Sequence, residues 1–165
     1  MTLCVGVKEV LQMNVENLKK LISSGESITV EFKESKNKLN RDLYESVCSF
    51  LNRHGGHIIL GVKDNGEILG VDKESASQLK KDFATSLNNP TKLNPIFYLN
   101  IDDFELDGKT ILYINIPESS QVHRCNGKIY DRNEDGDFDI TNDTNLVSGL
   151  YLRKQSTYTE NRIFP

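Results

Sequence analysis

Cysteine is scarce in this sequence. The 165 residues include three cysteines, Cys4, Cys48 and Cys125, which stand far apart without a C-x-x-C pair. An odd and sparse set of cysteines without metal-ligand spacing argues against a disulfide framework and against a cysteine-based metal site. It favours a reducing, cytoplasmic setting.

Long apolar runs are also missing. The longest ones, such as residues 58–60, are far shorter than the about 20 apolar residues that a membrane-spanning helix needs. Residues 1–12 lack the basic and apolar regions of a secretory signal. We therefore expect a cytoplasmic protein that has no membrane partner.

Neither sign of charge dominates. Twenty basic and twenty-four acidic residues give a formal net charge of −4. This balance argues against a strongly basic protein that coats DNA, although it leaves room for a local basic patch. The length and the 37% of hydrophobic residues indicate one globular domain with a real core.

Apolar residues recur at helical spacing in four segments. Asn14 is the expected cap of the first helix, which should end near Gly25. The chain from Gln155 to Pro165 is expected to be a tail or the start of a further region. The predicted helices lie around residues 18–22, 43–51, 76–87 and 146–153.

Strand patterns lie between these helices. Residues 28–33 alternate apolar and polar side chains, and residues 57–62 form a short apolar strand that a turn at Asp64-Asn65-Gly66 joins to residues 68–71. The pairs Asp107-Gly108 and Asn126-Gly127 predict two later hairpins, with arms at residues 97–104 and 109–116 and at residues 122–125 and 128–132. This mixed order predicts the α+β class, with antiparallel pairing instead of a doubly wound parallel sheet.

Glu26, Glu31 and Lys33 form the first candidate site. On a strand, Glu31 and Lys33 share one face, and a carboxylate beside a lysine is what metal-dependent nucleases use to bind a divalent cation and to stabilise phosphate charge. The alternative is an exposed strand face with ordinary charges. Asp64 likewise either joins this site or serves the turn in which it lies.

Two further patterns have competing interpretations. Gly55-Gly56 precedes a strand, whereas a phosphate-binding loop follows a strand and opens a helix, and the sequence has no Walker-type motif. Residues Asp131–Asp139 match the start of a calcium loop, but the twelfth position is Asn142 and a strand, not a helix, is expected before the loop. Calcium binding and a solvated acidic loop both stay open.

Basic residues cluster between the first strand and the second helix. Lysine and arginine side chains in such a loop can contact a phosphate backbone, although they also occur on ordinary soluble surfaces. No aromatic residue interleaves with them, so base stacking is not indicated there. The candidate phosphate-contacting residues are Lys36, Lys38 and Arg41, together with Lys80 and Lys81.

Several motifs together resemble the Schlafen-type AlbA_2 domain. They are V-E-F-K at residues 30–33, S-F-L-N-R-H-G-G at residues 49–56, I-I-L-G-V-K-D-N-G-E-I-L-G-V at residues 58–71, and Y-D-R at residues 130–132. S-F-L-N-R stands where the family usually has A-F-A-N-T, and the acidic run at residues 134–139 replaces a shorter loop. The resemblance covers roughly residues 14–155, which leaves an N-terminal extension at residues 1–13 and a tail at residues 156–165.

The resemblance implies a twisted, largely antiparallel sheet with flanking helices. It implies a nucleic-acid-binding domain, for DNA or RNA, of a transcriptional regulator or a RecG-like helicase-related protein, often as a homodimer. Nuclease members hold Mg²⁺ or Mn²⁺ with three carboxylates that match Glu26, Glu31 and Asp64, which would make this chain a metal-dependent endoribonuclease with Lys33 assisting. An older family label implies an ATP-binding or protein-interaction module instead.

Overall fold

The computed structural model describes residues 12–163, with side chains up to residue 156. The helices are α1 (Val15–Ser24), α2 (Leu43–Asn52), α3 (Ala76–Leu87) and α4 (Thr144–Ile163), and the short 3-10 helix η2 (Lys73–Ser75) leads into α3. The strands are β1 (Val30–Lys33), β2 (Gly56–Leu60), β3 (Ile101–Leu106), β4 (Lys109–Ile116), β5 (Tyr130–Asn133) and β6 (Gly136–Asp139).

Four strands form one mixed sheet in the order β1-β2-β4-β3. β1 runs parallel to β2, with Val30 opposite His57, whereas β4 pairs antiparallel with both β2 and β3. β5 and β6 form a separate antiparallel hairpin. The predicted α+β class, with a largely antiparallel sheet and flanking helices, is confirmed.

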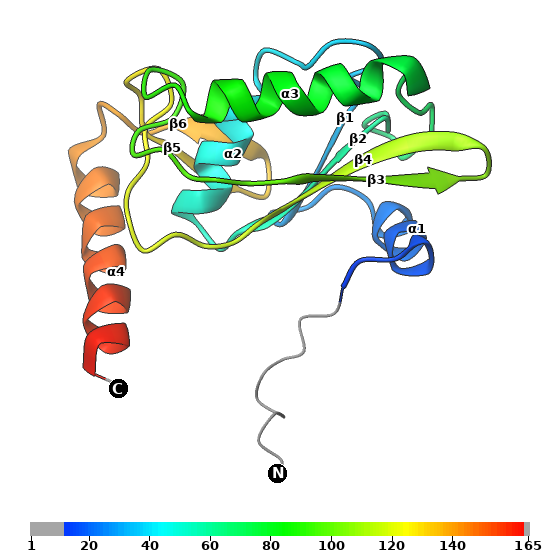
Figure 1. The fold of residues 1–165 in the computed structure, drawn as a ribbon. Coiled ribbons are helices and arrows are strands. Elements are labelled where there is room, and N and C mark those ends of the chain that lie inside the picture. The colour runs from blue at the N-terminus through cyan, green and yellow to red at the C-terminus, as the bar shows by residue number, and fades with distance from the viewer. Residues whose placement is uncertain (1–11, 164–165) are drawn as a thin grey trace.

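Helices cover both faces of the four-stranded sheet (Figure 1). Along β2, Ile58 and Leu60 belong to the core shared with α2 and α3, whereas Ile59 belongs to the core shared with α1. Successive side chains of a strand point to opposite faces, so this apolar run needs a cover on each side. A third, smaller cluster of Ile129, Ile140 and Leu150 packs α4 against the β5–β6 region.

The first helix has the boundaries that the sequence predicts, and the first hairpin forms around the predicted turn, although its first arm spans Ile101–Leu106 instead of residues 97–104. Asn14 caps α1, because its side-chain oxygen accepts the backbone N–H of Asn17 at 2.8 Å, and Gly25 ends the helix with φ +84°. Asp107 and Gly108 join β3 to β4 with φ +52° and +81°. Two successive positive φ values match the right-handed twist of the flanking strands.

Two predicted strand pairs differ in the structure. The turn after β2 forms, with Gly66 N–H donating to Lys63 O, but residues 68–71 make only isolated bridges and no strand. Asn126-Gly127 also forms its turn, yet residues 122–125 form no strand. β5 pairs instead with β6, in the segment expected to be an acidic loop. The second hairpin was therefore predicted with the wrong partner strand.

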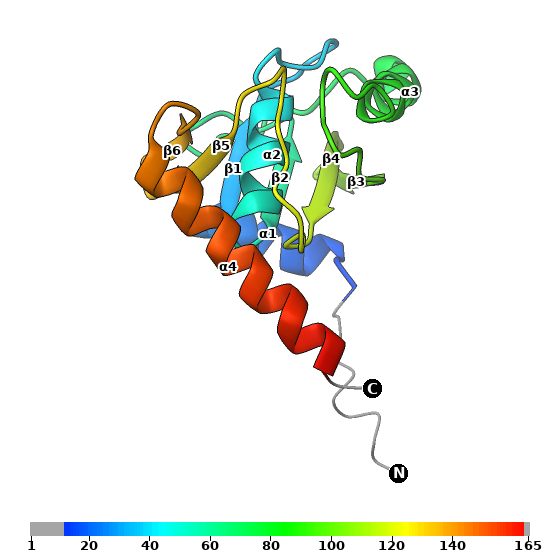
Figure 2. The ribbon, with the colours of Figure 1, turned by 90° about the vertical axis from the view of Figure 1, so that its left-hand side faces the viewer.

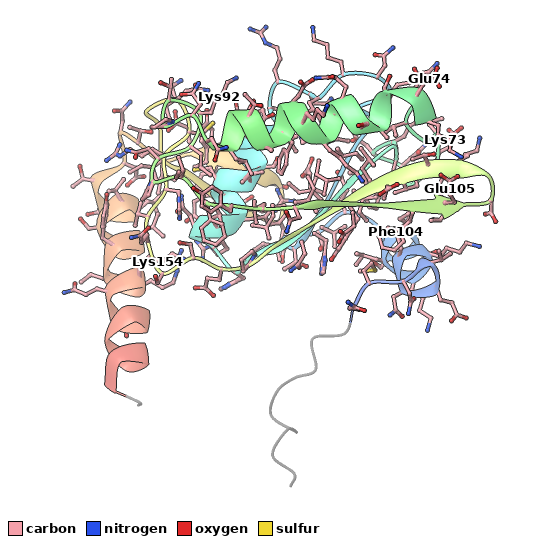
Figure 3. The ribbon with its side chains drawn as sticks, viewed as in Figure 1. Lys73, Glu74, Lys92, Phe104, Glu105 and Lys154 are labelled. Carbon is pink, nitrogen blue, oxygen red and sulfur yellow. The ribbon has the colours of Figure 1, made fainter. Side chains whose placement is uncertain are left out.

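α4 is longer than the sequence predicts. It continues through Gln155, where a tail was expected, to Ile163. Its buried Lys154 donates to Leu51 O at 3.1 Å and to Ser119 O at 2.7 Å, and Arg153 donates to Asn52 O at 2.9 Å (Figure 3 labels Lys154). Two cationic side chains thus satisfy carbonyls at the C-terminal end of α2, where cations are favoured. The domain boundary at residue 155 stays a prediction.

The cysteines within the described residues are reduced. Cys48 and Cys125 are free and buried, and burial raises their pKa to about 12 and about 11, which disfavours the reactive thiolate. Cys4 and most of the expected N-terminal extension lie outside the described residues. Among the helices that the structure describes, none combines the length and apolar character needed to cross a membrane.

Candidate functional site

A polar pocket of about 310 Å³ opens at the β1 edge of the sheet. Its walls come from the segment before and along β1, the start of α2, the turn after β2, and the β5–β6 hairpin. Eight carboxylates face two cations in its lining, which is a formal excess of six negative charges. The lining residues are Glu26, Ser27, Glu31, Lys33, Asp42, Glu45, Asp64, Arg132, Glu134, Asp135, Gly136 and Asp137.

Glu31 and Lys33 reach the pocket because β1 alternates its side chains. Val30 and Phe32 fill the core against α1, so Glu31 and Lys33 point to the other face, as the sequence predicts. Lys33 is buried, and its Nζ lies 3.1 Å from Asp42 Oδ1 and 3.5 Å from Glu31 Oε2. The lysine therefore ties β1 to the N-terminal end of α2.

Glu26 and Asp64 line the same pocket from two different turns. The Glu26 carboxylate turns back and accepts the backbone N–H of Phe32 at 2.9 Å. Burial raises the pKa of Glu26, and the nearby charges of Glu31 and Asp64 raise it further, against the lowering effect of the Phe32 hydrogen bond. Parallel pairing of β1 with β2 places the Asp64 turn beside this edge. All four predicted catalytic residues thus line one pocket.

Arg132 is the organising residue that sequence reasoning missed. It is 2% exposed, and its guanidinium contacts Glu31 Oε1 at 3.0 Å and Asp137 Oδ1 at 2.7 Å. It also donates to the carbonyls of Ser27 and Ile28 before β1, and it lies over the Phe50 ring at 4.3 Å. The only sequence signal was the Y-D-R motif, which gave no indication of these partners.

The β5–β6 hairpin forms one wall of the pocket. Asp137 accepts hydrogen bonds from the hydroxyls of Ser46 and Ser49 on α2, in addition to the contact with Arg132. Glu134 and Asp135 form the two-residue turn between paired Asn133 and Gly136, and both are exposed. The hairpin is therefore anchored to α2 through Asp137, close to its turn, and the turn itself carries two carboxylates without an ion pair to a described residue.

The predicted calcium loop is this hairpin. Its first residue, Asp131, is buried and held by a bidentate contact with Arg53 at 2.9 and 2.7 Å, so its carboxylate already has a partner. Within residues 12–163, no group of three or more His, Cys, Asp or Glu side chains is arranged to hold a metal ion. Glu26, Glu31 and Asp64 share a pocket, yet their carboxylates do not converge on one point.

The predicted phosphate-contacting residues fall into two sets. Lys36, Lys38 and Arg41 are exposed in the loop between β1 and α2, and no ion pair joins them to another described residue. Lys80 and Lys81 lie on α3. Lys80 is bound to Asp103 of β3 at 2.5 Å, so its charge is largely matched, whereas Lys81 is exposed.

Gly55 and Gly56 have a packing role that explains them without a bound phosphate. A Cβ on Gly55 would lie 2.4 Å from Ile116 O, and one on Gly56 would lie 2.5 Å from the Phe50 ring. Gly55 also has φ +76°, a left-handed conformation that favours glycine. The pair allows the end of α2 to turn tightly into β2 against β4.

Two histidines, His57 and His123, have structural partners. His123 is fully buried, and its ring nitrogens lie 2.8 Å from Pro95 O and 2.7 Å from Ser119 Oγ. His57 Nδ1 lies 2.6 Å from the Tyr113 hydroxyl, and burial lowers its pKa. Neither lines the polar pocket.

The sequence from residue 26 to residue 141 matches the model of the family described as Schlafen, AlbA_2. This match covers well over half of the chain, and the chain belongs to that family. The resemblance proposed from the V-E-F-K, Gly-Gly and Y-D-R motifs is confirmed. The matched range contains the whole pocket and the basic loop.

Known relatives agree with this assignment. An uncharacterized ATP-binding protein of Ureaplasma parvum serovar 3, UU034, is 36% identical over 86 residues, which are 50% of this chain and 24% of that protein. The DIP2311 protein of Corynebacterium diphtheriae has a similar fold, with a TM-score of 0.54 at 15% identity, over 74% of this chain and 28% of that one. The chain thus spans about a quarter of the length of these two relatives.

A third relative carries a helicase-related name. It is the N-terminal domain of a RecG-related ATP-dependent DNA helicase protein from Nitrosomonas europaea, with a TM-score of 0.50 and 23% identity. The similarity covers 66% of this chain and 74% of that domain. At this identity the similarity establishes a shared fold.

Proposed function

We propose that this chain is a nucleic-acid-binding domain of a transcriptional regulator or a helicase-related protein. The observation that carries the proposal is the loop between β1 and α2, which presents Lys36, Lys38 and Arg41 to solvent without ion pairs to other described residues. Free cations on one loop can displace the counterions of a phosphate backbone, which drives binding independently of base sequence.

The backbone of this basic loop (residues 34–42) is held in place. Lys33 and Asp42 close it at its base, the Ser35 hydroxyl donates to Asn40 Oδ1, and Lys36 O accepts the N–H of Asp72 at 2.7 Å. A loop that is already ordered loses less conformational freedom when it binds. Figures 1 and 2 both place the loop at the same end of the molecule as α3, which carries Lys81.

The family and the relatives' names support this context. The chain belongs to the Schlafen AlbA_2 family, and a similar fold occurs in the N-terminal domain of a RecG-related helicase protein. A domain that contacts nucleic acid in a protein of that kind needs an exposed basic surface. The exposed loop supplies the charge that such a contact requires.

Fluorescence anisotropy with labelled tRNA, duplex DNA and single-stranded DNA tests the proposal. Each phosphate that the protein neutralises on duplex DNA should contribute about −0.9 to the slope of log K against log salt concentration. Replacing Lys36, Lys38 and Arg41 together with glutamine should flatten that slope by about two to three units on duplex DNA. Absence of salt-sensitive binding to all three probes at low ionic strength would end the proposal.

A matched control removes the same charge elsewhere. Lys19, Lys20 and Lys109 lie on α1 and at the start of β4, outside the loop and the pocket. Replacing these three lysines with glutamine should leave the slope within about one unit of the wild-type value, because only contacted phosphates release counterions. Equal losses in the two triple variants would show non-specific attraction in place of a binding loop.

A second candidate is a divalent-metal-dependent endoribonuclease. The observation that favours it is that Glu26, Glu31 and Asp64 line one pocket together with Lys33. Carboxylate oxygens are the ligands that Mg²⁺ and Mn²⁺ prefer, and a bound ion would activate water and neutralise phosphate charge. Closer approach of the three carboxylates is needed for this chemistry, and the cation itself would supply the attraction.

Two measurements on the pocket test the second candidate. Mn²⁺ binding followed by calorimetry should be lost in Glu31→Gln and Asp64→Asn, and cleavage of a structured RNA should be lost in the same variants. Equal cleavage by wild type and variants would indicate a contaminating nuclease. Binding of Mn²⁺ without cleavage would leave a metal-stabilised binding domain.

The name of the Ureaplasma relative favours ATP as a third ligand to be tested. Any ligand that binds only the native state raises the melting temperature, by an amount set by RT ln(1 + [L]/Kd). A thermal shift with millimolar ATP and Mg²⁺, compared with Mg²⁺ alone, is therefore sufficient. An unchanged melting temperature would remove ATP as a ligand and leave the protein-interaction module as the remaining alternative.

A further inference from the structure

We propose that the turn of the β5–β6 hairpin, Glu134–Asp135, is a charge barrier that keeps nucleic-acid phosphates out of the polar pocket. The inference rests on the proposed nucleic-acid binding and concerns how that surface is limited. It assigns Glu134 and Asp135 as specificity-determining residues. They confine a bound strand to the basic loop unless cations neutralise the turn.

The turn and the basic loop lie on the rim of the same pocket. Lys33 and Asp42 line the pocket and also close the basic loop, so the loop begins and ends at the pocket rim. Glu134 and Asp135 line the same pocket from the hairpin. Figure 2 shows the hairpin beside β1, with the loop that leads from β1 to α2 above both. A phosphate chain on the loop would pass within range of both carboxylates.

The two carboxylates of the turn are not neutralised by a neighbouring cation among the described residues. No ion pair joins Glu134 or Asp135 to another described residue, and both side chains are exposed. By contrast, Glu31 and Asp137 on the same walls are held by Arg132. The turn therefore supplies two unmatched negative charges of the pocket's formal excess of six.

Hydrogen bonds fix the hairpin and its turn in place. Arg132 and the two α2 serines hold Asp137, and the Asn133 side chain accepts the N–H of Asp135 at 2.8 Å across the turn. A free loop would swing away from an approaching phosphate. This hairpin holds its two negative charges at the pocket. An approaching phosphate is therefore repelled unless cations neutralise these charges.

The size of the effect follows from Coulomb's law. Two unit charges about 8 Å from a phosphate, in a water-like dielectric, change the binding constant by about fivefold. Screening acts over about 30 Å at 0.01 M salt and about 3 Å at 1 M. The effect should therefore be visible at low ionic strength and absent at high ionic strength.

The experiment compares two double variants of the full chain. Glu134→Gln with Asp135→Asn neutralises the turn, and Glu16→Gln with Asp102→Asn removes the same charge from α1 and from β3, at the opposite edge of the sheet. Both pairs are exposed, so neither variant disturbs the core. Binding of a labelled single-stranded RNA is measured in EDTA at 10 mM and 500 mM salt, and again with Mg²⁺.

The turn variant should bind about fivefold more tightly than wild type at 10 mM salt in EDTA, and the control by less than about twofold. The gain should shrink at 500 mM salt and on addition of Mg²⁺. Equal affinities of the turn variant and the control would overturn the proposal while leaving nucleic-acid binding intact. Absence of binding in wild type and in both variants would overturn both. Binding by the turn variant alone would support the barrier and refute binding by the wild-type chain.

Discussion

Among single substitutions of the residues that line the pocket, Arg132→Met should lower the stability of the fold most. Arg132 is 2% exposed and its guanidinium serves two carboxylates and the backbone before β1. Methionine keeps part of the apolar contact with Phe50 but leaves Glu31 and Asp137 without their cation. The carbonyls of Ser27 and Ile28 also lose a donor.

The magnitude can be worked from these contacts. Removing one partner of a buried ion pair costs about 3–5 kcal/mol, because the other charge stays desolvated. Glu31 and Asp137 keep 18% and 16% exposure, so water recovers part of that cost and the lower value, about 3 kcal/mol, is expected. For a chain of this length, about 3 kcal/mol corresponds to a melting temperature lowered by about 6–12 °C.

Thermal melts followed by circular dichroism, with urea unfolding at 25 °C, measure this loss. Arg41→Met removes an equal charge from the exposed loop and should change stability by less than about 0.5 kcal/mol. Arg132→Lys keeps the charge without the fork of donors, and it should fall between Arg132→Met and wild type. A loss below about 1 kcal/mol in Arg132→Met would refute the organising role assigned to this residue.

Three further predictions concern other parts of the molecule. Because the pKa of Glu26 is raised on folding, its contribution to stability is present at low pH and is lost as pH rises through the folded pKa. Glu26→Gln should therefore have the same melting temperature as wild type at pH 3 and a higher one at pH 7. A lower melting temperature of the variant at pH 7 would contradict this. Lys154→Met should lower the free energy of unfolding by about 2–3 kcal/mol in urea, because the carbonyls of Leu51 and Ser119 lose a charged donor. Gly55→Ala should cost more than about 2 kcal/mol in thermal melts, whereas Gly108→Ala, with open space around it, should cost about 1 kcal/mol; similar losses would argue against the packing role of Gly55.

Local patterns explain why much of the fold was predictable. The cap at Asn14 and the turn at Asp107-Gly108 depend on residues a few positions apart, so the sequence alone specifies them. Strand alternation likewise placed Glu31 and Lys33 on one face of β1. The core follows the same logic, because its apolar residues recur at the helical and strand periods.

The parts that were missed depend on partners far along the chain. Arg132 contacts Glu31 across 101 positions, and Asp137 contacts Ser46 across 91 positions. No local pattern distinguishes an acidic turn that pairs β5 with β6 from an acidic loop that binds calcium. The contact with α2 decides between them, and it exists only once the chain has folded back on itself.

The sequence separation of the pocket walls also affects how the pocket forms. The wall formed by β1 belongs to the first fifth of the chain and the wall formed by the β5–β6 hairpin to the last quarter, so closing the pocket brings together Glu31 and Arg132 across 101 positions. Closing a loop of that length costs more conformational entropy than forming a local helix or hairpin. A nascent or truncated chain that ends before β5 would expose the edge of β1 without Arg132. The basic loop and the acidic β5–β6 hairpin therefore come together only in the completed fold. Fragments that end before β5 should bind phosphate without the repulsion from Glu134 and Asp135.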